Sequence, residues 1–108
     1  MIDHRPTLEI LPDREAVAQR AVALVAARLR EPGPVTLGLA TGATMTPFYA
    51  RLAEAVAAGE VSFRDATSFN LDEHVGVPAD EPGSFSLYMR VHFLAKVDMP
   101  EGRAHFLD

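Results

Sequence analysis

Hydrophobic and polar positions along the chain change period several times, and each change marks an expected element. From Asp13 onward, apolar residues recur at steps of three and four, the period of a helix with one buried face (Val17, Ala21, Leu24, Val25 and Leu29). Asp13 is the expected N-cap, and the stretch 31–34, Glu-Pro-Gly-Pro, cannot continue a helix. Before this helix, residues 7–10 alternate over a short distance and predict an edge strand.

Two further strands are expected where apolar runs end in polar residues. Residues 35–40 have the pattern of a parallel strand covered by helices on both faces, and residues 66–71 form the next strand. Between them the pattern predicts a helix over about 47–58, with Thr46 as its N-cap and Gly59 at its C-terminal end. Its expected buried face carries Tyr49, Leu52 and Val56, and Pro47 is its expected first residue.

The last third of the chain predicts one more helix and the start of one more strand. Ser84 is the expected N-cap of a helix whose apolar positions are Phe85, Tyr88, Met89 and Phe93, and residues 105–107 begin the strand. Alternating strands and helices predict an α/β fold, Rossmann-like and doubly wound, with a mostly parallel sheet and flanking helices. Because so few strands make a thin sheet of this kind, we interpret residues 1–108 as the N-terminal part of one α/β domain, truncated relative to a longer protein.

Composition narrows the classes of partner. A chain of 108 residues with 48% hydrophobic content can form a core, and its net charge of −5 with scattered Lys and Arg argues against nucleic acid or a membrane surface as partner. Without cysteine there is no disulfide or thiolate zinc site, and the four histidines show no metal-ligand spacing. The first residues lack a signal-peptide pattern, and the apolar run 21–27 is too short to cross a bilayer, so we expect a cytoplasmic protein.

Candidate binding residues follow the first of the two predicted central strands. Thr41, Gly42, Ala43 and Thr44 stand between a strand and a helix N-terminus, where free N–H groups and the helix dipole favour an anion such as phosphate. The same residues are also compatible with a tight turn selected only for its backbone geometry. The loop lacks the motifs of Walker A and dinucleotide-binding loops, which argues against ATP and NAD.

Candidate catalytic residues follow the second of these strands. Ligands of doubly wound sheets bind outside the carboxyl ends of the strands, so Asp72, Glu73 and His74 are expected to face the same crevice as the first loop. Asp72 is a candidate general base for removing a proton from carbon next to a carbonyl or imine. A solvated acidic loop is the alternative. Glu73, His74 and Phe85 are candidate neighbours of the substrate, although His74 is also compatible with an ordinary loop histidine.

Three segments occur together in an order that is typical of one family. They are LGLATGAT at 37–44, SFNLDEHVG at 68–76 and SFSLYM at 84–89, with Phe63 ahead of the second. Together they resemble the glucosamine-6-phosphate deaminase (isomerase) family, and the match runs from about residue 35 to 108. The pairing of T-G-x-T with F-N-x-D-E-x-V-G at this separation is far more specific than either motif alone.

The resemblance implies a sugar phosphate held by Thr41, Gly42, Ala43 and Thr44, and Asp72 as the base that moves a proton at C2 of the sugar. The products would be fructose 6-phosphate and ammonia, with no cofactor and no metal. Family members are usually more than twice as long as this chain and carry a later motif with further acidic residues and a ring-opening histidine. The 108 residues are therefore expected to be catalytically incomplete, and the resemblance leaves homo-oligomerisation of a full-length chain open.

Local departures from the family pattern leave the identity of the sugar open. Met45 stands where proline is common, His74 where tyrosine is usual and Phe85 where a lid tyrosine is frequent. The related 6-phosphogluconolactonases share the loop but typically show Asp-Glu-Arg and a later Ser-Asn, so this chain is closer to the deaminases. The lactonase is the enzymatic alternative, and a fragment with no independent function is another. A non-catalytic sugar-phosphate-binding domain, as in some repressors, predicts an N-terminal DNA-binding helix pair and no need for Asp72, and neither fits the sequence.

Overall fold

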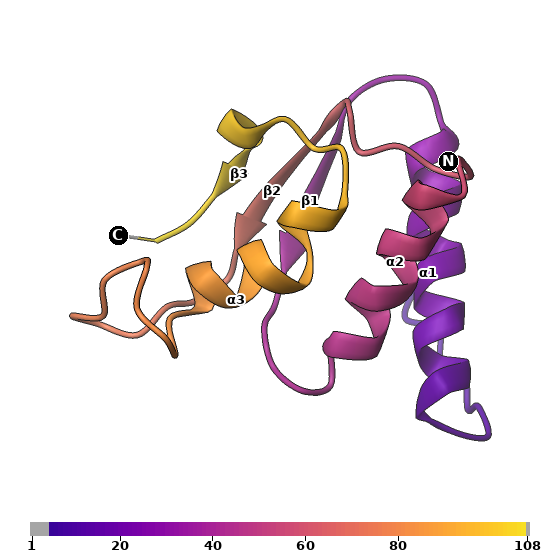
Figure 1. Cartoon of the computed structure of the whole chain (residues 1–108). Coiled ribbons are helices and arrows are strands. Elements are labelled where there is room, and N and C mark those ends of the chain that lie inside the picture. The colour runs from indigo at the N-terminus through magenta and orange to yellow at the C-terminus, as the bar shows by residue number, and fades with distance from the viewer. Residues whose placement is uncertain (1–4, 108) are drawn as a thin grey trace.

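The computed structural model describes residues 5–107 as three helices packed on one face of a three-stranded sheet (Figure 1). Two short 3-10 turns, Leu94–Lys96 and Glu101–Arg103, connect the last helix to the last strand. In chain order the elements are α1 (Arg14–Arg30), β1 (Val35–Leu39), α2 (Thr46–Ala57), β2 (Ala66–Asn70), α3 (Phe85–His92) and β3 (Ala104–His105).

All three strands are parallel and lie in the order β1-β2-β3. Five register pairs join β1 to β2, from Val35↔Ala66 to Leu39↔Asn70, whereas β3 joins β2 over only two residues. This arrangement confirms the predicted α/β fold with a parallel sheet. Both longer strands are one residue shorter than expected, ending at Leu39 and Asn70, and the predicted strand at 105–107 is placed at 104–105.

The helices cover only one face of the sheet in the part of the chain that the structure describes. On β2 the residues facing the helices, Ala66, Ser68 and Asn70, are 1%, 1% and 7% exposed. The next residues along, Phe69 and Leu71, are on the opposite face and are 49% and 64% exposed. The expectation that helices cover both faces of β1 is therefore wrong for residues 5–107, since Thr36 and Gly38 are exposed as well.

The first helix begins and ends where the sequence predicts, but it is rotated about its axis. The Asp13 carboxylate accepts a hydrogen bond from Ala16 N–H at 2.8 Å, as an N-cap does. Val17 and Leu24, which were expected to be buried, are both 54% exposed. The fully buried residues are Ala18 and Ala26, and Ala21, Val25 and Leu29, which were expected on the buried face, are partly buried together with Val22. Alanine allows α1 to approach α2 closely, which favours this face.

The second helix begins at Thr46, so Thr46 is its first residue and Met45 occupies the N-cap position. The Thr46 side chain makes no capping hydrogen bond, and Pro47 is the second helical residue, so both expectations about this end are corrected by one position. At the other end Gly59 adopts φ +75°, the left-handed conformation that glycine permits after a helix, as predicted.

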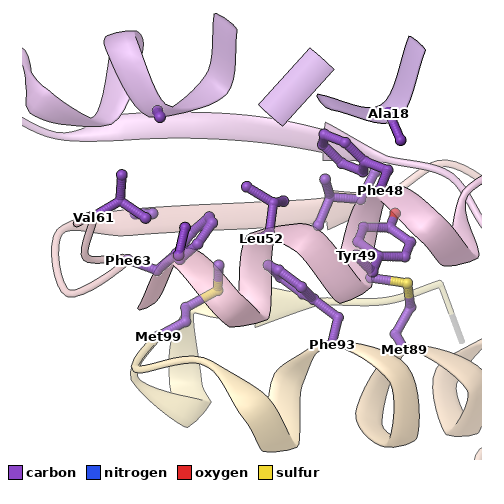
Figure 2. Packing of buried hydrophobic residues seen from close by; sticks show 13 residues of the cluster. Ala18, Phe48, Tyr49, Leu52, Val61, Phe63, Met89, Phe93 and Met99 are labelled. Carbon is purple, nitrogen blue, oxygen red and sulfur yellow. The ribbon is translucent and has the colours of Figure 1, made fainter. Parts of the chain in front are cut away.

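The core lies between the helices and the sheet (Figure 2). Tyr49 of α2 is fully buried, and its ring lies 5.1 Å from the ring of Phe93, centroid to centroid. Phe93 in turn meets Phe63 edge-on at 5.2 Å. Leu52 and Met89 complete the contact between α2 and the end of α3. The predicted apolar stripe on α3 is therefore confirmed for Met89 and Phe93, which are both 0% exposed.

The predicted edge strand at 7–10 is not formed. No strand partner pairs with these residues within 5–107, and Leu8 and Ile10 are 85% and 89% exposed. Among the helices that the structure describes, none is long and apolar enough to cross a membrane.

Candidate functional site

The loops that carry the candidate residues leave the sheet at the same edge. The arrowheads of β1 and β2 point to one end of the sheet in Figure 1, and the loops to α2 and towards α3 begin there. Leu39 and Asn70 form the last register pair, so Thr41 and Asp72 each stand two residues beyond it. Adjacent strands lie about 4.8 Å apart, so the two loops begin as neighbours.

The loop after β1 presents unpaired backbone donors. The N–H groups of Thr41, Gly42, Ala43 and Thr44 make no hydrogen bond to any residue that the structure describes. Gly42 has φ +123°, which side-chain-bearing residues rarely adopt, and its carbonyl accepts a hydrogen bond from Met45 N–H at 3.0 Å to close the turn. Successive free amides next to a helix N-terminus are the usual chemistry of an anion site.

Two tyrosines hold the carbonyl groups of this loop. The Tyr49 hydroxyl donates to the carbonyl of Ala40, and burial raises the pKa of Tyr49, which keeps it a donor. The Tyr88 hydroxyl donates to the Gly42 carbonyl at 2.9 Å and lies 2.8 Å from the Thr46 hydroxyl. The sequence predicts both tyrosines on the apolar faces of their helices but does not predict their hydrogen bonds to the loop. No short motif could have found them, because the partners are 9 and 46 positions apart.

Asp72 is exposed and has a free carboxylate. It makes no hydrogen bond or ion pair in the described structure, and it stands two residues after the end of β2. A carboxylate in this state can accept a proton without first breaking another interaction.

Glu73 makes three hydrogen bonds to backbone amides that the sequence did not predict. Its carboxylate accepts hydrogen bonds from Phe85 N–H at 2.8 Å and Ser86 N–H at 3.0 Å, which are the first amides of α3, and from His74 N–H at 3.0 Å. These bonds, that from Phe85 above all, lower the pKa of Glu73 to about 2. Glu73 thus fixes the segment after Asp72 to the N-terminus of α3, where a negative charge is favoured.

Ser84 caps the same helix end, as predicted. Its hydroxyl accepts a hydrogen bond from Leu87 N–H at 3.0 Å and donates to the Ala79 carbonyl at 2.8 Å. The ring of His74 lies 4.5 Å from the ring of Phe85, so these two candidate neighbours contact each other. The side chain of His74 is exposed.

A pocket of about 340 Å³ brings only some of the candidate residues together. Thr41 and Gly42 form one wall and Phe85 with other residues of α3 forms the opposite one. Asp72, Ala43 and Thr44 do not line this pocket, and Glu73 lines a separate one beside β3. Within residues 5–107 no cluster of three or more His, Asp or Glu side chains could hold a metal ion.

Asn70 lies near the candidate site and was not predicted from the sequence. It is only 7% exposed, and both polar atoms of its carboxamide have no hydrogen-bond partner within the described chain. It belongs to the last register pair of β1 and β2, two residues before Asp72, and is therefore at the edge of the sheet from which the candidate loops leave.

The sequence that forms these loops matches the model of a known protein family. The family model described as glucosamine-6-phosphate isomerases/6-phosphogluconolactonase covers residues 12–108. The chain belongs to this family.

Relatives within the glucosamine-6-phosphate isomerase/6-phosphogluconolactonase family are longer proteins. A glucosamine-6-phosphate deaminase of Rhodopirellula baltica is 41% identical over 98 residues, which is 91% of this chain and 39% of that protein. One from Cronobacter sakazakii is 44% identical over 75 residues, 69% of this chain and 28% of that protein. The chain therefore spans about two fifths or less of these curated relatives.

Solved structures of the family have the same fold. The structure of a monomeric glucosamine-6-phosphate deaminase superposes with a TM-score of 0.85 at 31% identity, over 89% of this chain and 40% of that one. A 6-phosphogluconolactonase of Thermotoga maritima gives a TM-score of 0.75 at 25% identity, over 91% of this chain and 44% of that one. The sheet and its helices are thus the arrangement found in both branches of the family.

Proposed function

We propose that this chain contributes the phosphate loop and the proton-transferring carboxylate of a glucosamine-6-phosphate deaminase. The observation that supports this most directly is the run of four unpaired amides at 41–44, which leaves the same carboxyl edge of the sheet as Asp72 with its free carboxylate. The curated relatives carry the deaminase name, which favours an amino-sugar phosphate over a phosphogluconolactone as substrate.

In this proposal the substrate phosphate accepts hydrogen bonds from the N–H groups of Thr41, Gly42, Ala43 and Thr44. Asp72 removes the proton from C2 of the open-chain sugar, and a proton is returned at C1, which leaves an imine at C2. Water then hydrolyses the imine, so that fructose 6-phosphate and ammonia leave. The conversion consumes one water and needs no oxidant or reductant. Glu73 does not take part in proton transfer, because its carboxylate is held by three amides.

Binding is tested on the chain itself by following the amide resonances of residues 41–44 by NMR during titration with glucosamine 6-phosphate. Glucosamine, which lacks the phosphate, is the matched control ligand. Shifts confined to this loop with the phosphorylated sugar and absent with glucosamine would support the phosphate assignment. If the loop does not respond, or responds equally to both, the assignment is wrong.

Turnover is tested in a chimera in which residues 12–108 replace the equivalent part of the Rhodopirellula baltica deaminase, with ammonia release as the readout. Asp72→Asn is expected to lower kcat by about 10²-fold to 10⁴-fold, the usual contribution of a general base, with little change in KM. Asp65→Asn makes the same chemical change at the exposed residue just before β2 and serves as the control. A chimera whose turnover survives Asp72→Asn would exclude Asp72 as the base.

The cytoplasmic location stays a prediction from the sequence, which leaves homo-oligomerisation of a full-length chain open.

A further inference from the structure

Tyr88 of α3 forms a hydrogen bond with the backbone of the phosphate loop, residues 41–44. The Gly42 carbonyl accepts hydrogen bonds from the Tyr88 hydroxyl at 2.9 Å, from Met45 N–H at 3.0 Å and from the Thr46 hydroxyl at 3.4 Å. The Thr46 and Tyr88 hydroxyls are also 2.8 Å apart, and either can be the donor in that contact. Thr46, Tyr88 and Gly42 thus form one hydrogen-bonded cluster, in which Tyr88 makes the shorter of the two side-chain bonds to the carbonyl.

The hydrogen bond from Tyr88 determines the orientation of the Gly42–Ala43 peptide group. In a planar trans peptide the C=O and the following N–H point in opposite directions. Because the Gly42 oxygen is held towards Tyr88, the Ala43 N–H is directed away from α3. Tyr49 does the same for the preceding part of the loop, since it holds the Ala40 oxygen and so directs the Thr41 N–H.

The tyrosine that holds Gly42 is itself on a well-anchored helix. The N-terminus of α3 is fixed by Glu73, and its C-terminal part is fixed in the core by Met89 and Phe93, both 0% exposed. The Tyr88 hydroxyl is therefore presented from a rigid element, which is what a positioning group requires. The same helix connects the phosphate loop to the residue that follows Asp72.

We propose that Tyr88 is a positioning residue that presets the Gly42–Ala43 peptide, so that the Ala43 N–H faces the phosphate. This inference rests on the proposed function in one respect, namely that the loop 41–44 binds phosphate. The orientation of the peptide is a property of the chain without ligand and can be tested separately.

The first experiment uses the chain without ligand. Tyr88→Phe removes only the hydroxyl, and the carbonyl-carbon resonance of Gly42 and the amide resonance of Ala43 are expected to move more than any others in the loop. Tyr49→Phe is the matched control, because it removes the other hydroxyl and is expected to move Ala40 and Thr41 instead. Ser62→Ala, a hydroxyl deletion outside the loop that removes a bond to Asp98, controls for general destabilisation. If Tyr88→Phe leaves Gly42 and Ala43 unchanged, or gives the same pattern as Ser62→Ala, the inference is overturned.

The second experiment titrates each variant with inorganic phosphate. Loss of one hydrogen bond worth about 1 kcal/mol corresponds to about fivefold weaker binding, which is expected for Tyr88→Phe and not for Ser62→Ala. In the chimera the same substitution is expected to raise KM more than it lowers kcat, because the hydroxyl acts on binding and not on Asp72. Unchanged phosphate affinity in Tyr88→Phe would overturn the proposed role in binding. A wild-type chain that binds no phosphate would refute the proposed function, whereas the ligand-free resonances would still decide whether Tyr88 orients the peptide.

Discussion

Phe93 directly follows α3 and joins this helix to the rest of the core, so its truncation is expected to be strongly destabilising. The side chain is 0% exposed, and its ring has two aromatic partners, Tyr49 at 5.1 Å and Phe63 at 5.2 Å. Burying such a ring is worth about 1.5–3 kcal/mol, and each aromatic pair adds about 0.5–1.5 kcal/mol. Phe93→Ala should therefore lower the free energy of unfolding by about 3–5 kcal/mol, the range seen for buried phenylalanine.

The assay is urea unfolding followed by circular dichroism, with Val91→Ala as the matched control. Val91 is on the same helix but is 53% exposed, so its truncation should change the free energy of unfolding by no more than about 0.5 kcal/mol. A domain of ordinary stability has only about 5–15 kcal/mol to lose, so Phe93→Ala is expected to be largely unfolded at modest urea concentrations. A loss below about 1 kcal/mol for Phe93→Ala, or equal losses for the two variants, would refute the view that Phe93 anchors α3.

Two further predictions concern polar groups near the site. The pKa of Glu73 is lowered to about 2, so its contribution to holding α3 is complete above its ordinary value near 4.5 and is lost as the pH falls towards 2. The amide resonances of Phe85 and Ser86 should accordingly titrate near pH 2, and a midpoint near 4.5 would mean that the hydrogen bonds are absent in solution. Asn70→Leu should raise the free energy of unfolding by about 1–3 kcal/mol, because it removes two buried polar atoms that have no partner within the described residues. A lower urea midpoint for this variant would show that the carboxamide is satisfied in solution.

The ends of the helices could be predicted because their determinants are local. Asp13 and Ser84 cap the helices that follow them, and Gly59 follows the end of α2 with the positive φ that its sequence position suggests. The hydrogen bonding of Thr46 could not be predicted from the neighbouring sequence. Its hydroxyl has the chemistry of a cap but pairs with Tyr88, 42 positions away, and that preference comes from the packing of α3 against the loop.

The location of the candidate site was also predictable, since chain topology alone places Thr41 and Asp72 at one edge of a parallel sheet. The roles of individual side chains were less accessible. Glu73 is adjacent to Asp72 and has the same chemistry, yet it binds amides 12 and 13 positions later. The rotation of α1 was missed for a similar reason, because alanines and valines alternate around the helix and only its contact with α2 decides which face is buried.

The distribution of polar and apolar side chains on the two faces of β2 has a consequence for the register of the sheet. In this strand Ser68 and Asn70 face the helices, whereas Phe69 and the residue after the strand, Leu71, face the open side, so hydrophobic alternation alone would favour the opposite orientation. A slip by one residue would bury the two large apolar side chains and release the two polar ones. The observed register leaves Phe69 and Leu71 on the sheet face that is uncovered within residues 5–107, and the hydrogen bond from Leu71 N–H to the Leu39 carbonyl at 3.1 Å continues it beyond the last strand pair. The alignment that brings Asp72 level with Thr41 therefore goes together with an open apolar face of the sheet within these residues.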